Sequence, residues 1–463
     1  MKPEIKFDVR GRNSGFYTRY VSGMLFPCHE FLKRHSSVSV RKSMEQTQWF
    51  SPEKIAQLQV EKLRQLLINA NTHVPYYRKL FADLDFQPEK IVSLADLQRL
   101  PFLDKPTIRA HLEDLKSDRA QGVARFNTGG SSGEPLVFFI GKERVSHDIA
   151  AKWRATRWWG VDIGDPEIVV WGSPIELGAQ DTLRTWRDRL FRSKLLPAFE
   201  MSDRKLDDFL DTIRRFRPGM LFGYPSALSH IAQYADKAGI AMHDLGIRVA
   251  FVTSERLYDD QRKQISHTFG CPVANGYGGR DAGFIAHECP AGGMHITAED
   301  IIVEIVDPHG YPLPHGESGE IVVTHLASGD FPFIRYRTGD IGTLDDKVCE
   351  CGRGLPLIRE IQGRTTDFVV ARDGTVMHGL ALIYILRDMP EIKVFRIIQE
   401  NLDLTRIQIV TETGLSPLQI DRIVESFQSR LGGDVVIRVE QVSDIPAEKS
   451  GKFRYVISKV AGI

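Results

Sequence analysis

The sequence lacks a dense cysteine pattern, a long apolar run and a net charge. Five cysteines in 463 residues are too few for the disulfide framework of small secreted domains. No run of about 18 apolar residues occurs, so no segment is predicted to cross a membrane. The charged start MKPEIKFDVRGRN has no apolar centre of the kind that a secretory signal needs. We therefore expect a cytoplasmic location.

The charges balance at 60 Lys and Arg against 60 Asp and Glu. They create no overall field that would attract nucleic acid, so no nucleic-acid partner is predicted. Hydrophobic residues make up 42% and charged residues 26% of the chain, which is typical of a globular protein. At about 150 residues per domain, the length predicts two or three domains.

Residues 1–50 form a basic arm, in which Lys and Arg outnumber the acids and apolar residues lie between them. One interpretation is an arm that packs its apolar residues on the main domain, which the frequency of basic surface helices favours. The other interpretation is peripheral contact with a membrane. In the segment LRTWRDRLFRSKLL at 183–196, apolar residues recur at helical spacing and predict an amphipathic helix that faces the core.

Helical and β-rich segments alternate through the middle of the chain. Helices are expected at 53–70 and 226–238, and strands at 168–172, 248–254 and 302–306. This alternation predicts a large layered α/β domain at 51–362. After Gly363 the pattern changes to short strands and a helix near 418–430, which predicts a small, mobile α+β domain at 363–463.

The segment FNTGGSSGEP at 126–135 follows an expected strand and is rich in glycine and hydroxyl side chains. Glycines let backbone N–H groups approach an anion, and hydroxyls add donors, so this loop can wrap a phosphate. It lacks the GK[ST] of the P-loop, which argues against a P-loop kinase or GTPase. Taken alone, such a Gly/Ser loop is more often a plain surface turn.

Four further segments occur in a fixed order: YGGRDAG (277–283), RYRTGD (335–340), GRTTDFV (363–369) and SGKFR (450–454). With the Gly/Ser loop, this set resembles the core motifs of the adenylate-forming superfamily of acyl-CoA ligases, adenylation domains and luciferases. It is similar in particular to phenylacetate-CoA ligase and its capsule-biosynthesis and deazaflavin-coenzyme-adenylylating relatives, which also carry a segment like GYPSAL at 223–228. The resemblance covers roughly residues 90–460.

The resemblance implies a nucleotide site with Mg²⁺. Asp281, where the family usually has Glu, is expected to hold Mg²⁺, since a carboxylate suits this hard cation. Asp340 is expected to accept hydrogen bonds from the ribose hydroxyls, and Arg364 to meet the ribose or a phosphate. The other nucleotide-binding residues that it implies are Thr128, Gly129, Gly130, Ser131, Ser132, Gly133, Ser254, Glu255, Tyr277 and Gly278.

Lys452 resembles the family's catalytic lysine, which neutralises charge between the carboxylate and the α-phosphate. Arg364 lies just before the expected hinge, where many relatives have an acid two residues later and this chain has Thr366. The resemblance also implies that Tyr224, Pro225 and Ser226 belong to the wall of the acyl-substrate pocket. A turn that ends a strand and begins a helix explains these three residues equally well.

Cys289 and His295 form a C-x5-H pair, and Cys349 and Cys351 form a C-x-C pair further on. Three thiolates and an imidazole are the donors of a closed tetrahedral zinc site, although the spacing is not that of a common zinc finger and buried free thiols explain it equally. Some phenylacetate-CoA ligase relatives carry a similar set, which favours zinc. With four protein ligands the role of Zn²⁺ would be structural.

The resemblance therefore implies ATP-dependent activation of a small carboxylic acid to an acyl-adenylate, with pyrophosphate release and transfer to coenzyme A. One alternative is transfer to a non-CoA acceptor in polysaccharide biosynthesis. Another is a catalytically silent nucleotide-binding scaffold, favoured by the departures at Asp281, Thr366 and Glu134. The joint presence of Asp340, Arg364 and Lys452 favours an enzyme. The acid and the oligomeric state, a homodimer included, stay open.

Overall fold

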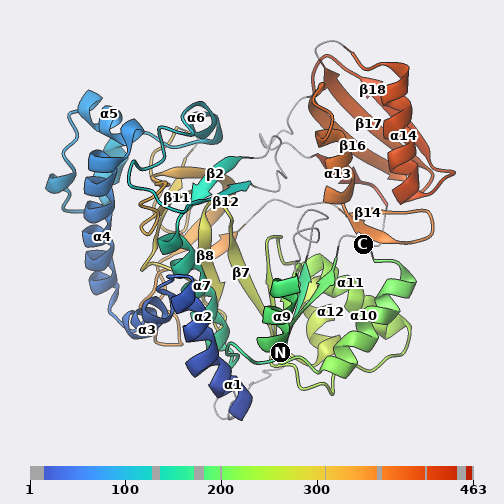
Figure 1. The fold of residues 1–463 in the computed structure, drawn as a ribbon, viewed down its shortest axis with the longest axis horizontal. Coiled ribbons are helices and arrows are strands. Elements are labelled where there is room, and N and C mark those ends of the chain that lie inside the picture. Colours follow the sequence, from blue (N-terminus) through green and yellow to red (C-terminus); the bar gives the residue numbers. More distant parts are fainter. Residues whose placement is uncertain are drawn as a thin grey trace.

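The computed structural model describes residues 15–127, 136–171, 182–198, 201–307, 309–361, 368–411, 414–445 and 455–460. The Gly/Ser loop from Thr128 to Gly133, Arg364 with the expected hinge, and Lys452 lie outside these residues. The predicted domain boundary after residue 362 also lies outside them, so the predicted domain limits stay a prediction. Figure 1 shows the chain from its N-terminal helices to its C-terminal sheet.

A sheet of 11 strands runs through the described part of the chain (Figure 1). Its order is β10 (Ile301–Val306), β11 (Ser318–His325), β12 (Tyr336–Asp345), β13 (Leu357–Ile361), β9 (Met294–Ile296), β8 (Gly283–Glu288), β7 (Val273–Gly279), β6 (Val249–Thr253), β5 (Met220–Gly223), β3 (Glu167–Trp171) and β4 (Ser193–Pro197). The pairs from β4 to β7 are parallel, and those from β7 to β10 are antiparallel. All five residues of β6 are buried, as expected for a parallel strand that is covered on both faces.

Helices flank this sheet, and their buried apolar residues belong to the hydrophobic clusters around it. The helices are α3 (Ser37–Thr47), α4 (Pro52–His73), α5 (Pro75–Asp83), α6 (Lys105–Ala110), α7 (Lys142–Trp158), α10 (Asp203–Phe216), α11 (Pro225–Lys237) and α12 (Asp259–Phe269), with short turns η2 (Pro88–Lys90) and η3 (Leu94–Arg99). Local signals set their starts: the side chain of Ser51 accepts from the Lys54 N–H, and Pro52 takes the first position of α4. The helices and strands predicted for this region are confirmed within a few residues.

The C-terminal part is a smaller α+β unit (Figure 1, upper right). Its sheet has the order β18 (Val436–Gln441), β17 (Leu404–Thr411), β16 (Ile392–Asn401) and β19 (Val456–Ser458). Helices α13 (Leu380–Arg387) and α14 (Pro417–Leu431) pack on it, and β14 (Phe368–Val370) pairs with β15 (Val376–His378). The predicted fold class, a large layered α/β part with a small α+β part, is confirmed. A separate hairpin of β1 (Ala124–Asn127) and β2 (Val137–Ile140) flanks the Gly/Ser loop.

The described part of the basic arm includes one continuous helical segment, α1 (Phe16–Tyr20), η1 (Val21–Leu25) and α2 (Phe26–Leu32). Helix α9 (Thr182–Leu190) lies beside it, since the Tyr17 hydroxyl donates to the Leu190 carbonyl at 2.8 Å. The prediction of a core-facing helix over 183–196 is wrong in two respects. Trp186 and Leu190 are exposed, and the helix ends at Leu190, so that residues 193–196 belong to β4 instead. Among the described residues, no helix is long and apolar enough to cross a membrane.

His287 in β8 is a buried histidine whose two ring nitrogens have no hydrogen-bond partner among the described residues. Desolvation, with a contribution from the charge of Arg154, lowers its pKa from 6.5 to about 3. The unfolded chain therefore binds a proton below pH 6.5 that the folded chain does not bind until near pH 3, so acid destabilises the fold across this window.

We expect the free energy of unfolding to fall by about 1.4 kcal/mol per pH unit for this one group as the pH drops below 6.5. Urea titrations at several pH values measure the slope, and His287→Leu is expected to reduce it by this amount. The exposed His315 provides the control, because His315→Gln should leave the slope unchanged. An identical slope in His287→Leu would contradict the assignment.

Candidate active site

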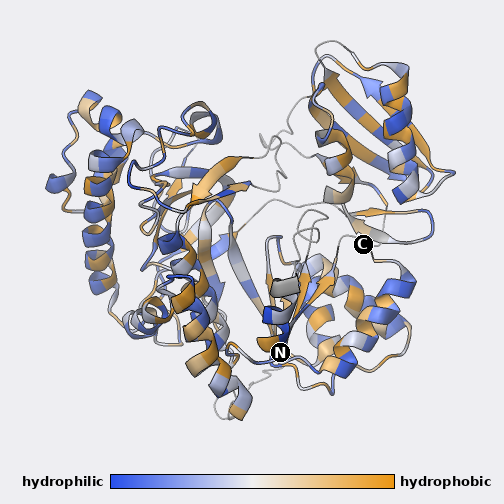
Figure 2. Cartoon of the chain, viewed as in Figure 1, coloured by the Kyte–Doolittle hydropathy of each residue, from blue (hydrophilic) through white to orange (hydrophobic). Residues whose placement is uncertain are grey.

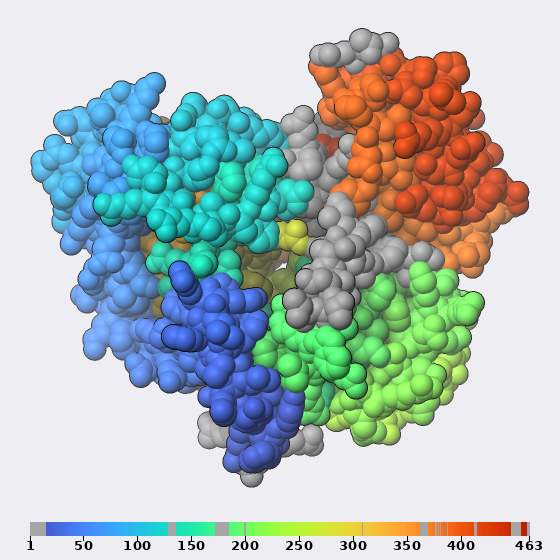
Figure 3. Space-filling model, viewed as in Figure 1, coloured from blue at the N-terminus to red at the C-terminus, as the bar shows by residue number. Residues whose placement is uncertain are grey.

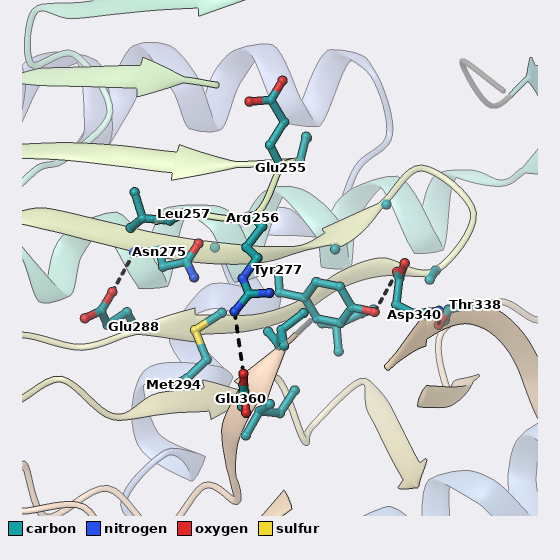
Figure 4. A pocket seen from close by; sticks show the side chains of 18 of the residues that line it. Glu255, Arg256, Leu257, Asn275, Tyr277, Glu288, Met294, Thr338, Asp340 and Glu360 are labelled. Carbon is teal, nitrogen blue, oxygen red and sulfur yellow. Dashed lines mark hydrogen bonds and ion pairs between the residues drawn. The ribbon is translucent and has the colours of Figure 1, made fainter. Parts of the chain in front are cut away.

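A cavity of about 320 Å³ is lined by residues of β7, β12 and β13 and of the segment that follows β6 (Figure 4). The predicted nucleotide residues Ser254, Glu255, Tyr277 and Gly278 line it, together with Asp281 and Asp340. The structure thus gathers six predicted site residues from three separate sequence motifs around one space. The space-filling view shows this face of the molecule hollowed between the cyan and green parts of the chain (Figure 3).

Tyr277 and Asp340 contact one another across the cavity (Figure 4). The Tyr277 hydroxyl donates to Asp340 Oδ2 at 3.0 Å, and the Asp340 backbone N–H donates to the Thr338 hydroxyl at 3.1 Å. These bonds orient the carboxylate of β12 toward the ring of β7. An aromatic face beside a carboxylate suits a nucleoside, because the ring can stack on a base while the carboxylate accepts from sugar hydroxyls.

Asp281 is held at the cavity by a buried tyrosine. The Tyr336 hydroxyl donates to Asp281 Oδ2 at 2.6 Å, and Tyr336 is fully buried. The loop that carries Arg280 and Asp281 has a second contact. The buried Arg144 guanidinium donates to the carbonyl of Arg280 at 2.9 Å. Tyr336 lies inside the RYRTGD motif, yet its role in fixing the carboxylate was not predicted from the sequence.

Ser254 follows β6 with a positive φ of 74°, a conformation that non-glycine residues rarely adopt. Such strain concentrates at functional sites, where the surroundings hold it in place. Next to it, Glu255 accepts hydrogen bonds from both the backbone N–H and the hydroxyl of Ser226. Gly278 is required by packing, because a Cβ there would lie 2.3 Å from the carbonyl oxygen of Gly283.

The three residues predicted for the acyl pocket do not line this cavity. Tyr224 is buried and stacks on Trp171 with ring centroids 4.3 Å apart, and Pro225 begins α11. Only Ser226 reaches the site, through Glu255. The segment does form a strand end that begins a helix, at the junction of β5 and α11, and its place in the acyl-substrate wall stays a prediction.

Two polar contacts at the cavity were not predicted from the sequence. Arg256 forms an ion pair with Glu360 at 3.6 Å, and Glu288 accepts from the Asn275 backbone N–H at 2.8 Å (Figure 4). Arg256 follows β6, and Glu360 lies in β13. Because the two residues are far apart in the sequence, no local pattern predicts that they form a pair. They place a cation and an anion in a part of the cavity wall that lies outside the family motifs.

The predicted metal ligands Cys289, His295, Cys349 and Cys351 come together, with all four donor atoms within 4.8 Å of one another. The Sγ atoms of Cys289 and Cys349 are 3.6 Å apart, and Cys351 Sγ is 3.2 Å from His295 Nε2. A tetrahedron with Zn–S bonds of about 2.3 Å has S–S edges of about 3.8 Å. The four donors therefore have the spacing of a closed tetrahedral metal site.

His295 is prepared to act as a ligand. Desolvation lowers its pKa to about 4, so the ring is neutral at physiological pH. Its Nδ1 lies 3.3 Å from the Leu355 carbonyl, which places the ring proton there and leaves the lone pair of Nε2 facing the cysteines. Gly293 allows the close approach, because a Cβ there would lie 2.6 Å from Cys349 Sγ.

Comparisons with known proteins agree with this geometry. The family model of AMP-binding enzymes matches residues 195–327, and that of the CapK C-terminal domain matches residues 369–459. A phenylacetate-coenzyme A ligase of Thermus thermophilus is 29% identical over 73% of this chain and 77% of its own length. Protein CapK of Staphylococcus aureus is 22% identical over 87% of this chain and 89% of its own length.

Among solved structures, 2-hydroxyisobutyryl-CoA ligase in complex with 2-HIB-AMP and CoA matches with a TM-score of 0.64. The identity is 20%, and the match covers 88% of this chain and 90% of that chain, so it bears on the fold. Together the fold and the matched families define an AMP-forming ligase of the adenylate-forming class. Within that class the chain is phenylacetate-CoA ligase-like and has capsule-associated relatives.

Proposed function

We propose that this protein activates a small carboxylic acid with ATP in the cavity between β6, β7 and β12. An oxygen of the carboxylate attacks the α-phosphorus of ATP, the bond to pyrophosphate breaks, and an acyl-adenylate forms. The observation that best supports this proposal is that one cavity is lined by Ser254, Glu255, Tyr277, Asp281 and Asp340. Appearance of ATP–pyrophosphate exchange on addition of a carboxylic acid tests the proposal.

In this proposal each side chain has a definite task. Tyr277 borders the adenine, and Asp340, oriented by the Tyr277 hydroxyl at 3.0 Å, accepts from the ribose hydroxyls. Thr128 to Gly133 hold the phosphates, Arg364 meets the ribose or a phosphate, and Lys452 lies between the carboxylate and the α-phosphate. The small C-terminal domain carries Lys452 in for adenylation and away for transfer, as hinge motions do in enzymes with two half-reactions.

Asp281 is the residue proposed to hold Mg²⁺, which would neutralise charge on the phosphates. One of its oxygens already accepts from Tyr336 at 2.6 Å and the other from the Ala282 N–H at 3.1 Å. These bonds fix the direction of the carboxylate before the cation arrives, so Tyr336 is a positioning residue.

Tyr336→Phe removes this hydroxyl and keeps the buried ring. We expect the Mg²⁺ concentration that gives half-maximal ATP–pyrophosphate exchange to rise about tenfold, because a hydrogen-bond partner that orients a metal ligand contributes about 10–100-fold to metal affinity. The exchange rate at saturating Mg²⁺ should change much less. Tyr311→Phe, at an exposed tyrosine, is the control. An unchanged Mg²⁺ dependence in Tyr336→Phe would remove the positioning role.

The second half-reaction in our proposal transfers the acyl group to coenzyme A. The thiol sulfur attacks the acyl carbon, AMP leaves, and the thiol proton is released. Names of the relatives support this acceptor, since several are coenzyme A ligases. ATP and coenzyme A are both cytoplasmic metabolites, so the proposal keeps the cytoplasmic location predicted from the sequence.

A second acceptor class is supported by the match to the CapK C-terminal domain and to CapK along most of its length. In that case a sugar hydroxyl or amine would take the acyl group. Mass spectrometry of the products with and without coenzyme A separates the two. An acyl-CoA product supports the first proposal, whereas exchange without any thioester favours the sugar acceptor.

We also propose that the four-donor cluster holds a structural Zn²⁺. Cys289 follows β8, His295 lies in β9, and Cys349 and Cys351 precede β13. An ion held there would brace the strands β8, β9 and β13, which also carry cavity residues such as Met294 and Glu360. The role of the ion would be to keep these three strands, and the cavity residues on them, in position.

A further inference from the structure

The first helical segment, 16–32, presents apolar side chains to solvent along one face. Phe16, Tyr20, Met24, Phe31 and Leu32 form this apolar stripe, in which most members are four residues apart and therefore share one helix face. Phe16 is 89% exposed, Phe31 80% and Leu32 81%. Figure 2 shows the hydrophobic colour along this segment at the lower edge of the molecule. Large apolar groups gathered on one face mark an interaction surface.

The opposite face of the same segment is firmly attached to the protein. The buried Thr18 hydroxyl donates to Asp165 at 2.9 Å, and the Phe26 ring packs edge-on against Trp153 at 5.0 Å. Val21 is fully buried between these contacts. The segment is therefore docked by its inner face, and the apolar stripe is held outward in a fixed direction.

Helix α9, which contacts the first helical segment, also exposes apolar side chains. Trp186 is 60% exposed, Leu190 is 47% exposed, and the two lie one helical turn apart. Tyr17 joins the helices through its bond to the Leu190 carbonyl, and Phe191 packs against Phe26 at 5.7 Å. Two neighbouring helices thus both expose large apolar side chains.

The exposed charge beside the apolar stripe is positive. Arg19, Lys33 and Arg34 are exposed on the first segment, and Arg189 is exposed on α9. The acid of residues 15–36 is Glu30, which is 1% exposed and bound by His29 and His35 at 3.0 and 3.1 Å. Apolar and aromatic residues flanked by exposed cations are the composition of helices that lie in the interface of an anionic membrane.

We propose that the apolar stripe and Trp186 dock this protein on the surface of an anionic phospholipid bilayer. The side chains enter the boundary between headgroups and acyl chains, and Arg19, Lys33 and Arg189 face the lipid phosphates. Charge complementarity favours lipid over a second copy of the chain, because a symmetric dimer through this face would bring its cations together. The proposal goes beyond acid activation: it places that reaction at a membrane surface.

Vesicle co-sedimentation of the full chain tests the proposal. The wild type is expected to pellet with phosphatidylcholine vesicles that contain phosphatidylglycerol, and much less with phosphatidylcholine alone. Phe31→Ser/Leu32→Ser should lower the partition coefficient about tenfold or more, because two large side chains no longer enter the bilayer. Arg19→Glu/Lys33→Glu should lower binding to the anionic vesicles about tenfold and leave binding to neutral vesicles unchanged.

Matched controls exist elsewhere on the chain. Leu418 on α14 is also 80% exposed, so Leu418→Ser should pellet like the wild type. Lys79→Glu/Lys263→Glu makes the same change in net charge at two exposed lysines elsewhere and should also pellet like the wild type. Equal melting temperatures check folding, and Met24→Ser replaces the first variant if its melting temperature falls.

The proposal is overturned if the wild type stays in the supernatant with anionic vesicles, or if the stripe variants pellet like Leu418→Ser. A dimer that Phe31→Ser/Leu32→Ser converts to a monomer, without any lipid binding, would assign the stripe to self-association. ATP–pyrophosphate exchange by all variants in free solution should match the wild type, so failure here is distinct from failure of the proposed function.

Discussion

Replacing Lys452 with alanine is expected to lower the rate of ATP–pyrophosphate exchange by about 10²–10³-fold. A point cation at developing negative charge in a site that excludes water stabilises the transition state, and removal of one such group costs about 2.7–4 kcal/mol. In the proposed cycle the lysine leaves the site before transfer. Transfer from a supplied acyl-adenylate to coenzyme A should therefore slow much less than exchange does.

Lys459 is the matched control for this experiment. It lies seven residues further on, is exposed, and its ammonium group bonds to Glu400 at 2.5 Å on the surface of the C-terminal sheet. Lys459→Ala changes the same charge in the same segment and should leave exchange near the wild-type rate. Undiminished exchange in Lys452→Ala would remove this lysine from the mechanism, and equal losses in both variants would point to the fold of the segment instead.

Replacing Cys351 with serine is expected to remove bound zinc and to lower the melting temperature by roughly 5–10 °C. Binding to a closed four-ligand site contributes to folding free energy, and each kcal/mol lost shifts the melting temperature by roughly 2–4 °C in domains of 150–250 residues. Elemental analysis of the purified protein gives the metal content, and differential scanning calorimetry gives the melting temperature.

The two cysteines outside the cluster provide the controls. Cys28 is exposed and Cys271 is buried elsewhere in the core, so Cys28→Ser and Cys271→Ala should both keep the zinc. A wild-type protein without zinc would reject the metal site. Loss of stability in Cys351→Ser with zinc retained would show that the thiol stabilises the fold by packing, as a buried free cysteine does.

Short motifs made much of the site predictable from the sequence. Asp281 and Asp340 are implied by the family resemblance because each lies in a short motif, and the structure brings both to one cavity. The metal-like cluster was predicted from its Cys and His pairs. The antiparallel pairing of β9 with β8 and β13 then brings the two pairs together across some sixty residues of chain.

Other features depend on which elements become neighbours, and the sequence carries no local signal for that. The ion pair of Arg256 with Glu360 joins the segment after β6 to β13, and only the sheet order places these two around one cavity. Helical spacing predicts the helix that forms as α9, but residues 193–196 of the same segment form β4, and periodicity does not tell whether an apolar face meets the core or the solvent. Trp186 and Leu190 meet the solvent, and the prediction of a core-facing helix was wrong for that reason.

Acid-dependent ATP–pyrophosphate exchange is the most direct test of the central claim. A panel of aryl, fatty and sugar-derived carboxylic acids is supplied with ATP, Mg²⁺ and labelled pyrophosphate, with Asp340→Asn beside the wild type. We predict that at least one acid supports exchange by the wild type, and that Asp340→Asn needs a higher ATP concentration for half-maximal exchange because the ribose loses a charged acceptor. No exchange with any acid, in a wild type that still binds ATP, would contradict acid activation and favour a silent nucleotide-binding scaffold.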